Sequence, residues 1–76
     1  MTEQEWRRAF SDRLSFMMRR CKLTQRELAK ASDMTEAAIS YYLTEQKTPN
    51  FKSIINLAYT FGCTIEDLID FGESIY

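Results

Sequence analysis

The chain offers few side chains suited to catalysis or metal binding. Its 76 residues include two cysteines, Cys21 and Cys63, and no histidine. A zinc site would need two further ligands, and histidine is the side chain most often used for proton transfer near neutral pH. The sequence also lacks a glycine-rich phosphate loop and a spaced pair of nucleophile and base. We therefore expect no enzyme, no metal and no cofactor, and we interpret both cysteines as small, partly buried apolar residues rather than a disulfide.

Better candidates for ligand contact lie on two short runs with helical spacing between residues 23 and 50. Thr24 caps the first run and Glu27 completes a capping box, while Thr35 caps the second run. Helices of about two turns are unstable alone, so both must pack on other parts of the chain. The joint between them is about three residues long and includes Asp33, which tolerates left-handed backbone. Such a joint forces a large angle between the helices, which is helix-turn-helix geometry.

The elements that must hold these two runs in place are also predicted to be helical. Apolar residues at intervals of three and four predict a first helix over about residues 3–21. Asn50 caps a fourth helix that ends at Gly62, and Thr64 caps a short fifth helix. The side chains expected to face inward are Trp6, Phe10, Leu14, Met17, Leu28, Ala29, Ala31, Ile39, Tyr42, Phe51, Ile54, Ile55, Leu57, Ala58, Phe61, Ile65, Leu68 and Ile69. The sequence therefore predicts an all-α fold, a compact five-helix domain.

Length and charge set further limits. Seventy-six residues leave room for one domain, residues 1–76, with the helix-turn-helix at about 24–44 and a C-terminal tail at 70–76. No apolar run reaches the roughly 18 residues of a membrane span, and the polar N-terminus is unlike a secretory signal, so we expect a cytoplasmic protein. The net charge is −1, but residues 1–31 carry eight basic and four acidic residues, whereas residues 32–76 carry two and seven. This asymmetry can place a positive surface on a near-neutral protein.

Three segments of the chain resemble one known family. The segment "LTQRELAKASDMTEAAISYYL" resembles the helix-turn-helix of the phage Cro/C1-type repressor family. The segment "TPNFKSIINLAYTFGCTIEDLI" is similar to the closing helices of that family, and "FSDRLSFMMRRCK" is similar to its first helix. The resemblance covers Phe10 to Ile69. It implies a lambda-repressor-like fold and a sequence-specific regulator, bacterial or phage, that binds double-stranded DNA as a homodimer. The residues themselves point to no membrane and no small-molecule substrate.

The resemblance also implies which residues contact DNA. Residues 35–43 match the recognition helix of the family, which lies in the major groove. The positions that match its base-facing positions are Glu36, Ala37, Ser40 and Tyr41. The positions that match its phosphate-contacting positions, or supply charge beside them, are Gln25, Arg26, Thr35, Thr44, Lys47 and Thr48. Glutamate accepts a hydrogen bond from cytosine N4, alanine contacts the thymine methyl group, and tyrosine can reach phosphate or stack.

Two departures from the family pattern keep a second interpretation open. The base-facing positions are poor in cations and Glu36 is repelled by phosphate, so attraction must come from other residues. The basic residues nearby in sequence are Arg13, Arg19, Arg20, Lys22, Arg26 and Lys47. Glu45 takes the place of a glycine that is common after the recognition helix. The leading hypothesis is a small repressor, and the alternative is an antitoxin- or antirepressor-like module that keeps the fold but binds a protein through its acidic C-terminal half.

Several apolar residues have no place in this helical pattern. Phe16 and Met18 lie off the inward stripe of the first helix, and Phe71, Ile75 and Tyr76 add apolar surface to the tail. Either these residues fold back on one another within the molecule, or the fifth helix and the tail form a dimer contact. We favour intramolecular packing and keep dimerisation as the alternative.

Overall fold

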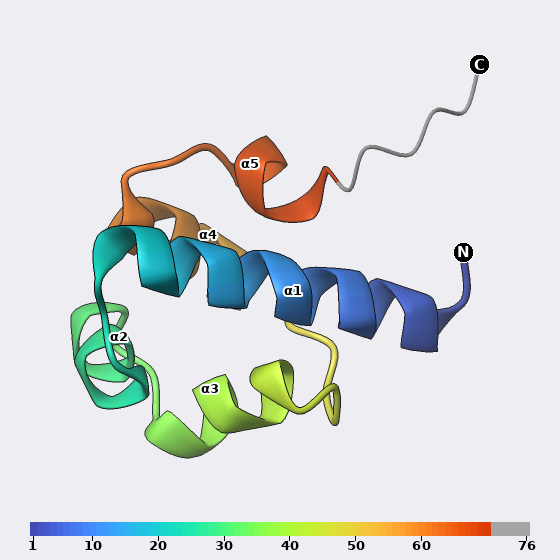
Figure 1. Cartoon of the computed structure of the whole chain (residues 1–76), viewed down its shortest axis with the longest axis horizontal. Helices are drawn as coiled ribbons and strands as arrows, with labels where there is room; N and C mark the ends of the chain where they lie inside the picture. The colour runs from blue at the N-terminus through green and yellow to red at the C-terminus, as the bar shows by residue number, and fades with distance from the viewer. Residues whose placement is uncertain (71–76) are drawn as a thin grey trace.

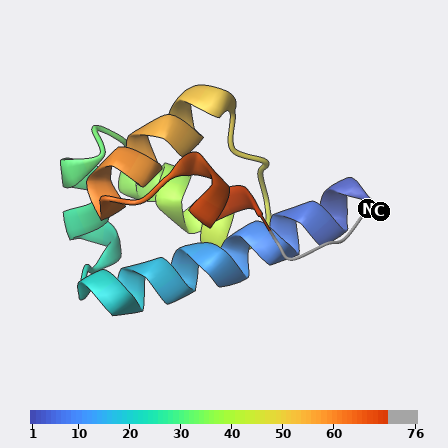
Figure 2. The ribbon, with the colours of Figure 1, turned by 90° about the horizontal axis from the view of Figure 1, so that it is seen from above.

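A computed structural model describes residues 1–70 of the chain, which fold into five α-helices and contain no strand. The helices are α1 (Glu3–Cys21), α2 (Gln25–Ala31), α3 (Glu36–Leu43), α4 (Phe51–Phe61) and α5 (Ile65–Ile69). α1 runs along most of the molecule, and α2 and α3 lie on one side of it (Figure 1). The second view shows α4 across from α1, with α5 between them (Figure 2). The all-α, five-helix prediction is confirmed.

Every helix in the described chain begins at a capping side chain. Each cap residue has extended backbone, and its side-chain oxygen accepts the N–H of the residue three positions later. The caps are Thr2, Thr24, Thr35, Asn50 and Thr64. At three of them, Thr2, Thr24 and Thr64, the backbone N–H of the cap also donates to the carboxylate three positions later, which completes a capping box. The four starts predicted from capping residues are therefore confirmed, and Thr2 adds a fifth.

Four of the helices end in the same way, with one residue in left-handed backbone. These residues are Lys22 (φ 57°), Asp33 (φ 57°), Glu45 (φ 62°) and Gly62 (φ 69°). The N–H of the next residue then donates to a carbonyl five residues earlier, as Met34 does to Ala29 at 2.8 Å. This arrangement, the Schellman motif, satisfies the last carbonyls of the helix and reverses the chain direction. The predictions for Asp33 and Gly62 are confirmed, and the loop after α3 adopts the left-handed conformation although it carries Glu45.

One hydrophobic core joins all five helices. Its fully buried large side chains are Phe10, Leu14, Leu28, Ile39, Leu57 and Leu68. Each helix contributes at least one of them, and burying such a side chain stabilises the fold by about 1.5–3 kcal/mol relative to leaving it exposed. The two-turn helices α2 and α3 are therefore held by the same core as the longer helices.

Three side chains that were expected inside lie at the surface. Ala31 is exposed, and Phe51 and Ile55 have 65% and 40% of their surface accessible. At the end of α2 the next residue, Ser32, is buried instead. Its burial is tolerated because its hydroxyl donates a hydrogen bond to the Leu28 carbonyl oxygen at 2.7 Å. In α4 the core-facing stripe is narrower than expected and consists of Ile54, Leu57, Ala58 and Phe61.

The two off-stripe residues of α1 have different environments. Met18 is buried and packs in the core, as expected for intramolecular packing. Phe16 is 49% exposed and lines a shallow pocket beside Arg13 and Arg20. The residues of the tail to which the same prediction applied, 71–76, lie outside the described part of the chain.

The left-handed backbone at Gly62 and Lys22 leads us to expect opposite effects on stability from two substitutions. A Cβ built on Gly62 meets no atom within 4 Å, so Gly62→Ala adds backbone strain and no clash. Strain of about 1–2 kcal/mol, partly offset by the lower entropy of the unfolded chain, lowers the free energy of unfolding by about 1 kcal/mol. Lys22→Gly relieves the same backbone strain and therefore raises the free energy of unfolding by about 0.5–1 kcal/mol. Urea denaturation measures both, and a loss of stability in Lys22→Gly would contradict the assignment.

Candidate nucleic-acid interface

The inner face of α3 fixes the orientation of this helix. Ile39 is fully buried, and Tyr42 is 8% exposed. The Tyr42 ring meets Phe10 of α1 edge to face, with 5.9 Å between the ring centroids, and its hydroxyl lies 3.1 Å from the Ser53 hydroxyl of α4. One side chain of α3 therefore contacts two other helices, which sets the rotation of α3 about its own axis.

The C-terminal end of α3 is held by α1. The Ser11 hydroxyl is buried and donates to the Leu43 carbonyl at 2.7 Å, so α1 satisfies one of the free carbonyls at the end of α3. In the loop that follows, Glu45 accepts a hydrogen bond from the Gln4 amide at 3.2 Å. Because these contacts join residues 32 and 41 positions apart, they fix where the end of α3 lies relative to α1.

Most of the predicted base-contacting residues lie on the opposite, outer face of α3. Glu36 and Ala37 are exposed at the start of the helix, Tyr41 is 37% exposed one turn later, and Ser40 is half-buried. In the described chain the Glu36 side chain has no hydrogen bond or ion pair. Lys47 lies with its ammonium group 4.5 Å from the centre of the Tyr41 ring, a cation–π contact. The structure therefore places one cation beside an outer face that otherwise carries an acid.

The predicted phosphate-contacting residues at the two helix starts are also accessible. Thr35 caps α3 by accepting the Ala38 N–H at 3.0 Å, and its hydroxyl hydrogen stays available. Gln25 and Arg26 are exposed in the first turn of α2, and their side chains have no hydrogen bond or ion pair within the described range. Helix starts attract anions because their first N–H groups are free and the helix dipole is positive there.

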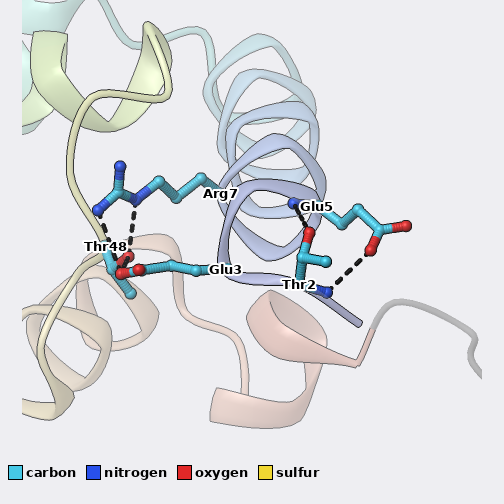
Figure 3. Close-up of polar contacts among 5 residues, drawn as sticks. All are labelled: Thr2, Glu3, Glu5, Arg7 and Thr48. Carbon is cyan, nitrogen blue, oxygen red and sulfur yellow. Dashed lines mark hydrogen bonds and ion pairs between the residues drawn. The ribbon is translucent and has the colours of Figure 1, made fainter.

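The two loop threonines already have partners within the molecule. Thr44 donates to the Ser40 carbonyl at 2.7 Å and accepts from Gln46. The Thr48 hydroxyl donates to the Glu3 carboxylate at 2.8 Å and accepts from Arg7 at 2.9 Å, so it lies against the start of α1 (Figure 3). The Thr48 hydroxyl is thus already bonded to side chains at the start of α1, whereas Lys47 lies against Tyr41 on the outer face of α3.

The contact between Thr48 and α1 also shifts the pKa of a carboxyl group. The Thr48 hydroxyl, and then the Arg7 charge, lower the pKa of Glu3. Arg7 and Glu3 lie 3.1 Å apart and form the single ion pair between residues 1 and 70. The contacts of Arg7 with Thr48, of Ser11 with Leu43 and of Gln4 with Glu45 join residues more than 30 positions apart, so no local spacing in the sequence predicts them. The Arg7–Glu3 pair, by contrast, has the i, i+4 spacing of neighbours on one helix.

One of the arginines expected to attract DNA is directed elsewhere. Arg13 donates to the backbone carbonyls of Asp67 and Asp70 at the end of α5, the second at 3.0 Å. Arg13 and Arg20 both lie close enough to Asp67 to lower the pKa of its carboxyl group, after the larger effect of the Thr64 backbone N–H. The remaining basic candidates, Arg19, Arg20, Lys22, Arg26 and Lys47, are exposed.

The cysteines lie away from the outer face of α3. Cys21 and Cys63 are free thiols, half-buried in the same shallow pocket, and burial raises the pKa of Cys63. Among residues 1–70 no group of three or more metal-ligating side chains is present. No helix in this range combines the length and apolarity required to cross a membrane.

Comparison with known proteins agrees with the helix-turn-helix geometry. The family profile described as the Cro/C1-type HTH DNA-binding domain matches residues 13–73, well over half of the chain. No curated protein and no solved structure matches the chain.

The contact in Figure 3 makes a prediction about pH. Thr48→Val removes the main hydrogen bond to Glu3, so the pKa of Glu3 rises toward its ordinary value. A carboxyl group whose pKa is lower in the folded than in the unfolded protein stabilises the fold at pH values above its unfolded pKa. This stabilisation is lost as the pH falls through the pKa of the folded state. The stability difference between wild type and variant therefore shrinks in that acidic window.

NMR titration of the side-chain carboxyl carbons measures the shift directly. Glu5 is the internal control, because the backbone N–H of Thr2 lowers its pKa and the substitution leaves that contact intact (Figure 3). An unchanged Glu3 titration in Thr48→Val would show that this contact does not form in solution.

Proposed function

The chain belongs to the Cro/C1-type helix-turn-helix DNA-binding domain family, and from this premise we propose that it is a small transcriptional regulator that places α3 in the major groove of its operator. One observation carries the proposal. The start of α3 presents Glu36 and Ala37 unobstructed to solvent, while the inner face and the end of the same helix are fixed by the core and α1. A rigid helix with a free polar start is what base recognition requires.

In this proposal the outer face of α3 distinguishes bases. Glu36 accepts a hydrogen bond from cytosine N4, and Ala37 contacts a thymine methyl group. Tyr41 and Ser40 lie one turn further along, where Ser40 has less free surface. Each good contact of this kind discriminates against the wrong base by about 1–3 kcal/mol.

The residues proposed to contact phosphate divide into those whose side chains are free and those that must first give up a hydrogen bond within the molecule. Gln25, Arg26, Thr35 and Lys47 are exposed and can reach the backbone of DNA without breaking a hydrogen bond of the described chain. Thr44 and Thr48 would have to exchange partners within the molecule for phosphate. We therefore assign the main backbone contacts to the first group.

The balance of charge sets the expected affinity. Glu36 would face the negative backbone, and Arg13 bonds to the end of α5, so the cations left for phosphate are few. A single domain then binds modestly, and two copies on a two-fold operator provide specific occupancy. Such a dimer acts in the cytoplasm of a bacterium, or of a bacterium that carries a phage, by blocking access of polymerase to the promoter.

A second function is supported by the acidic character of the same surface. Glu36 has no counter-charge in the described chain, and the whole sequence has a net charge of −1. An antitoxin- or antirepressor-like module would use this face to bind a basic protein partner rather than DNA.

The test uses a duplex selected from a random-sequence library and fluorescence anisotropy at 50 and 200 mM salt. Glu36→Gln removes the charge that DNA phosphates repel. It also replaces a side chain that accepts a hydrogen bond from cytosine with one that can bond to adenine. We expect the variant to bind unrelated DNA more tightly than the wild type does. We also expect its preference at one base pair to change by about 10- to 100-fold. Binding by the wild type should weaken steeply with salt, on the order of 10³-fold if a dimer neutralises about six phosphates.

Glu66→Gln is the matched control, because Glu66 is also an exposed glutamate in the first turn of a helix, but on α5. It should leave the base preference unchanged. If the wild-type protein selects no duplex at low salt while a protein partner co-purifies with it, the second function replaces the first.

A further inference from the structure

α4 carries an apolar stripe that the described fold leaves uncovered. Phe51, Ile55 and Tyr59 follow one another at intervals of four, so they lie along one side of the helix. Their surfaces are 65%, 40% and 88% accessible. The core-facing residues of α4 lie on the neighbouring side, so the stripe is separate from the core. We infer that this α4 stripe (Phe51, Ile55 and Tyr59) is the surface through which two copies of the chain pair.

The order of residues in the α4 stripe favours a second copy over an unrelated partner. Ile55 lies at the centre, with one aromatic ring a turn before it and one a turn after it. In an antiparallel pair with its two-fold axis at Ile55, Phe51 of each copy meets Tyr59 of the other. A two-fold interface requires this reciprocity, and the stripe satisfies it with apolar side chains at all three positions. Aromatic pairs of this kind contribute beyond the area that they bury.

The surface beside the stripe suits the same arrangement. A shallow recess lies between Ile55 and Tyr59 on α4 and the turn Ala31 to Asp33 between α2 and α3. The partner's Phe51 would enter it beside Tyr59. Lys52 is the single charged residue of α4, and an antiparallel pairing places the two copies of Lys52 toward opposite ends of the contact, where they do not repel each other strongly.

The area indicates the strength of the contact. Large aromatic side chains have about 150–250 Å² to bury, so the exposed fractions of the three residues amount to roughly 400 Å² per chain. Complete burial of both stripes would remove at most about 800 Å², which is below the roughly 1,000 Å² of a specific, stable interface and lies in the range of weak, transient contacts. The pair is therefore weak and depends on concentration, as suits a protein that assembles on its operator.

The pairing deepens the proposed function, in which two copies act on one operator, and it is compatible with DNA binding. The two-fold axis of an antiparallel α4 pair passes between the two helices, perpendicular to both, and like any two-fold axis it places the two α3 helices at the same level along it. In the structure α3 lies at a different face from α4, below α1 in the first view (Figure 1), while α4 lies across from α1 in the second (Figure 2). The residues that line the recess beside the stripe do not include Glu36 or Ala37, so the inferred pairing leaves the start of α3 uncovered.

Sedimentation equilibrium of the full chain without DNA tests the inference. The wild type should dimerise reversibly, and Ile55→Glu, which places two like charges at the axis, should weaken the dimer by roughly a hundredfold. Tyr59→Glu should act in the same direction. Phe16→Glu is the matched control, since Phe16 is an exposed aromatic residue on α1 and its replacement should leave the dimer intact. Circular dichroism verifies that each variant is folded.

A cross-linking measurement checks the position of the axis. With Cys21 and Cys63 replaced by serine, Ile55→Cys should form a disulfide between chains on mild oxidation, and Phe16→Cys should not. A wild type that stays monomeric at millimolar concentration, or a dimer that Phe16→Glu breaks and Ile55→Glu does not, overturns the inference. Dimerisation through α4 with no DNA binding would instead leave this inference standing and reject the proposed function.

Discussion

The packing of α3 against α1 is the contact on which the candidate interface depends. A helix of eight residues is too short to be stable in water, so its direction is decided by the surface on which it lies. Ile39 and Tyr42 provide that surface on the inner side, and the hydrogen bond from Ser11 to the Leu43 carbonyl fixes the end. Because these contacts use the inner side and the end of α3, its outer side and its start remain free.

The left-handed residues at four helix ends supply the second constraint. They turn the chain sharply enough for short helices to cross at large angles with connections of only a few residues. Asp33 does this between α2 and α3, and Glu45 does it after α3. The Glu45 side chain is also held by Gln4, so the loop that carries Lys47 is tied to α1. The position of the cation beside Tyr41 therefore follows from the same packing that orients the helix.

The charges of the molecule are arranged for the fold as much as for a ligand. Arg7 and Arg13, which looked like part of a basic N-terminal half, bond to Thr48 and to the carbonyls at the end of α5. What remains near the helix-turn-helix is a small number of exposed cations and one acid at the start of α3. Such a surface discriminates between partners more readily than it attracts them, which is why a paired arrangement of two weak domains suits it.

The sequence by itself determined the helices and most of the core. Capping residues and apolar spacing act within three or four positions, so Thr24, Thr35, Asn50 and Gly62 could be placed without coordinates, and the family resemblance agreed with the profile match over residues 13–73. These signals are local, and they are strong because unsatisfied backbone groups at a helix end are costly.

Only the tertiary structure decided which side of each element is covered and which polar groups are already used. It buried Ser32 instead of Ala31 and left Phe51 and Ile55 exposed, because the core is one surface shared by five helices and each helix covers only part of it. It also joined Thr48 to Glu3, which lies 45 positions earlier in the chain. Contacts over such distances depend on the crossing angles of whole helices, and no spacing within the sequence encodes them.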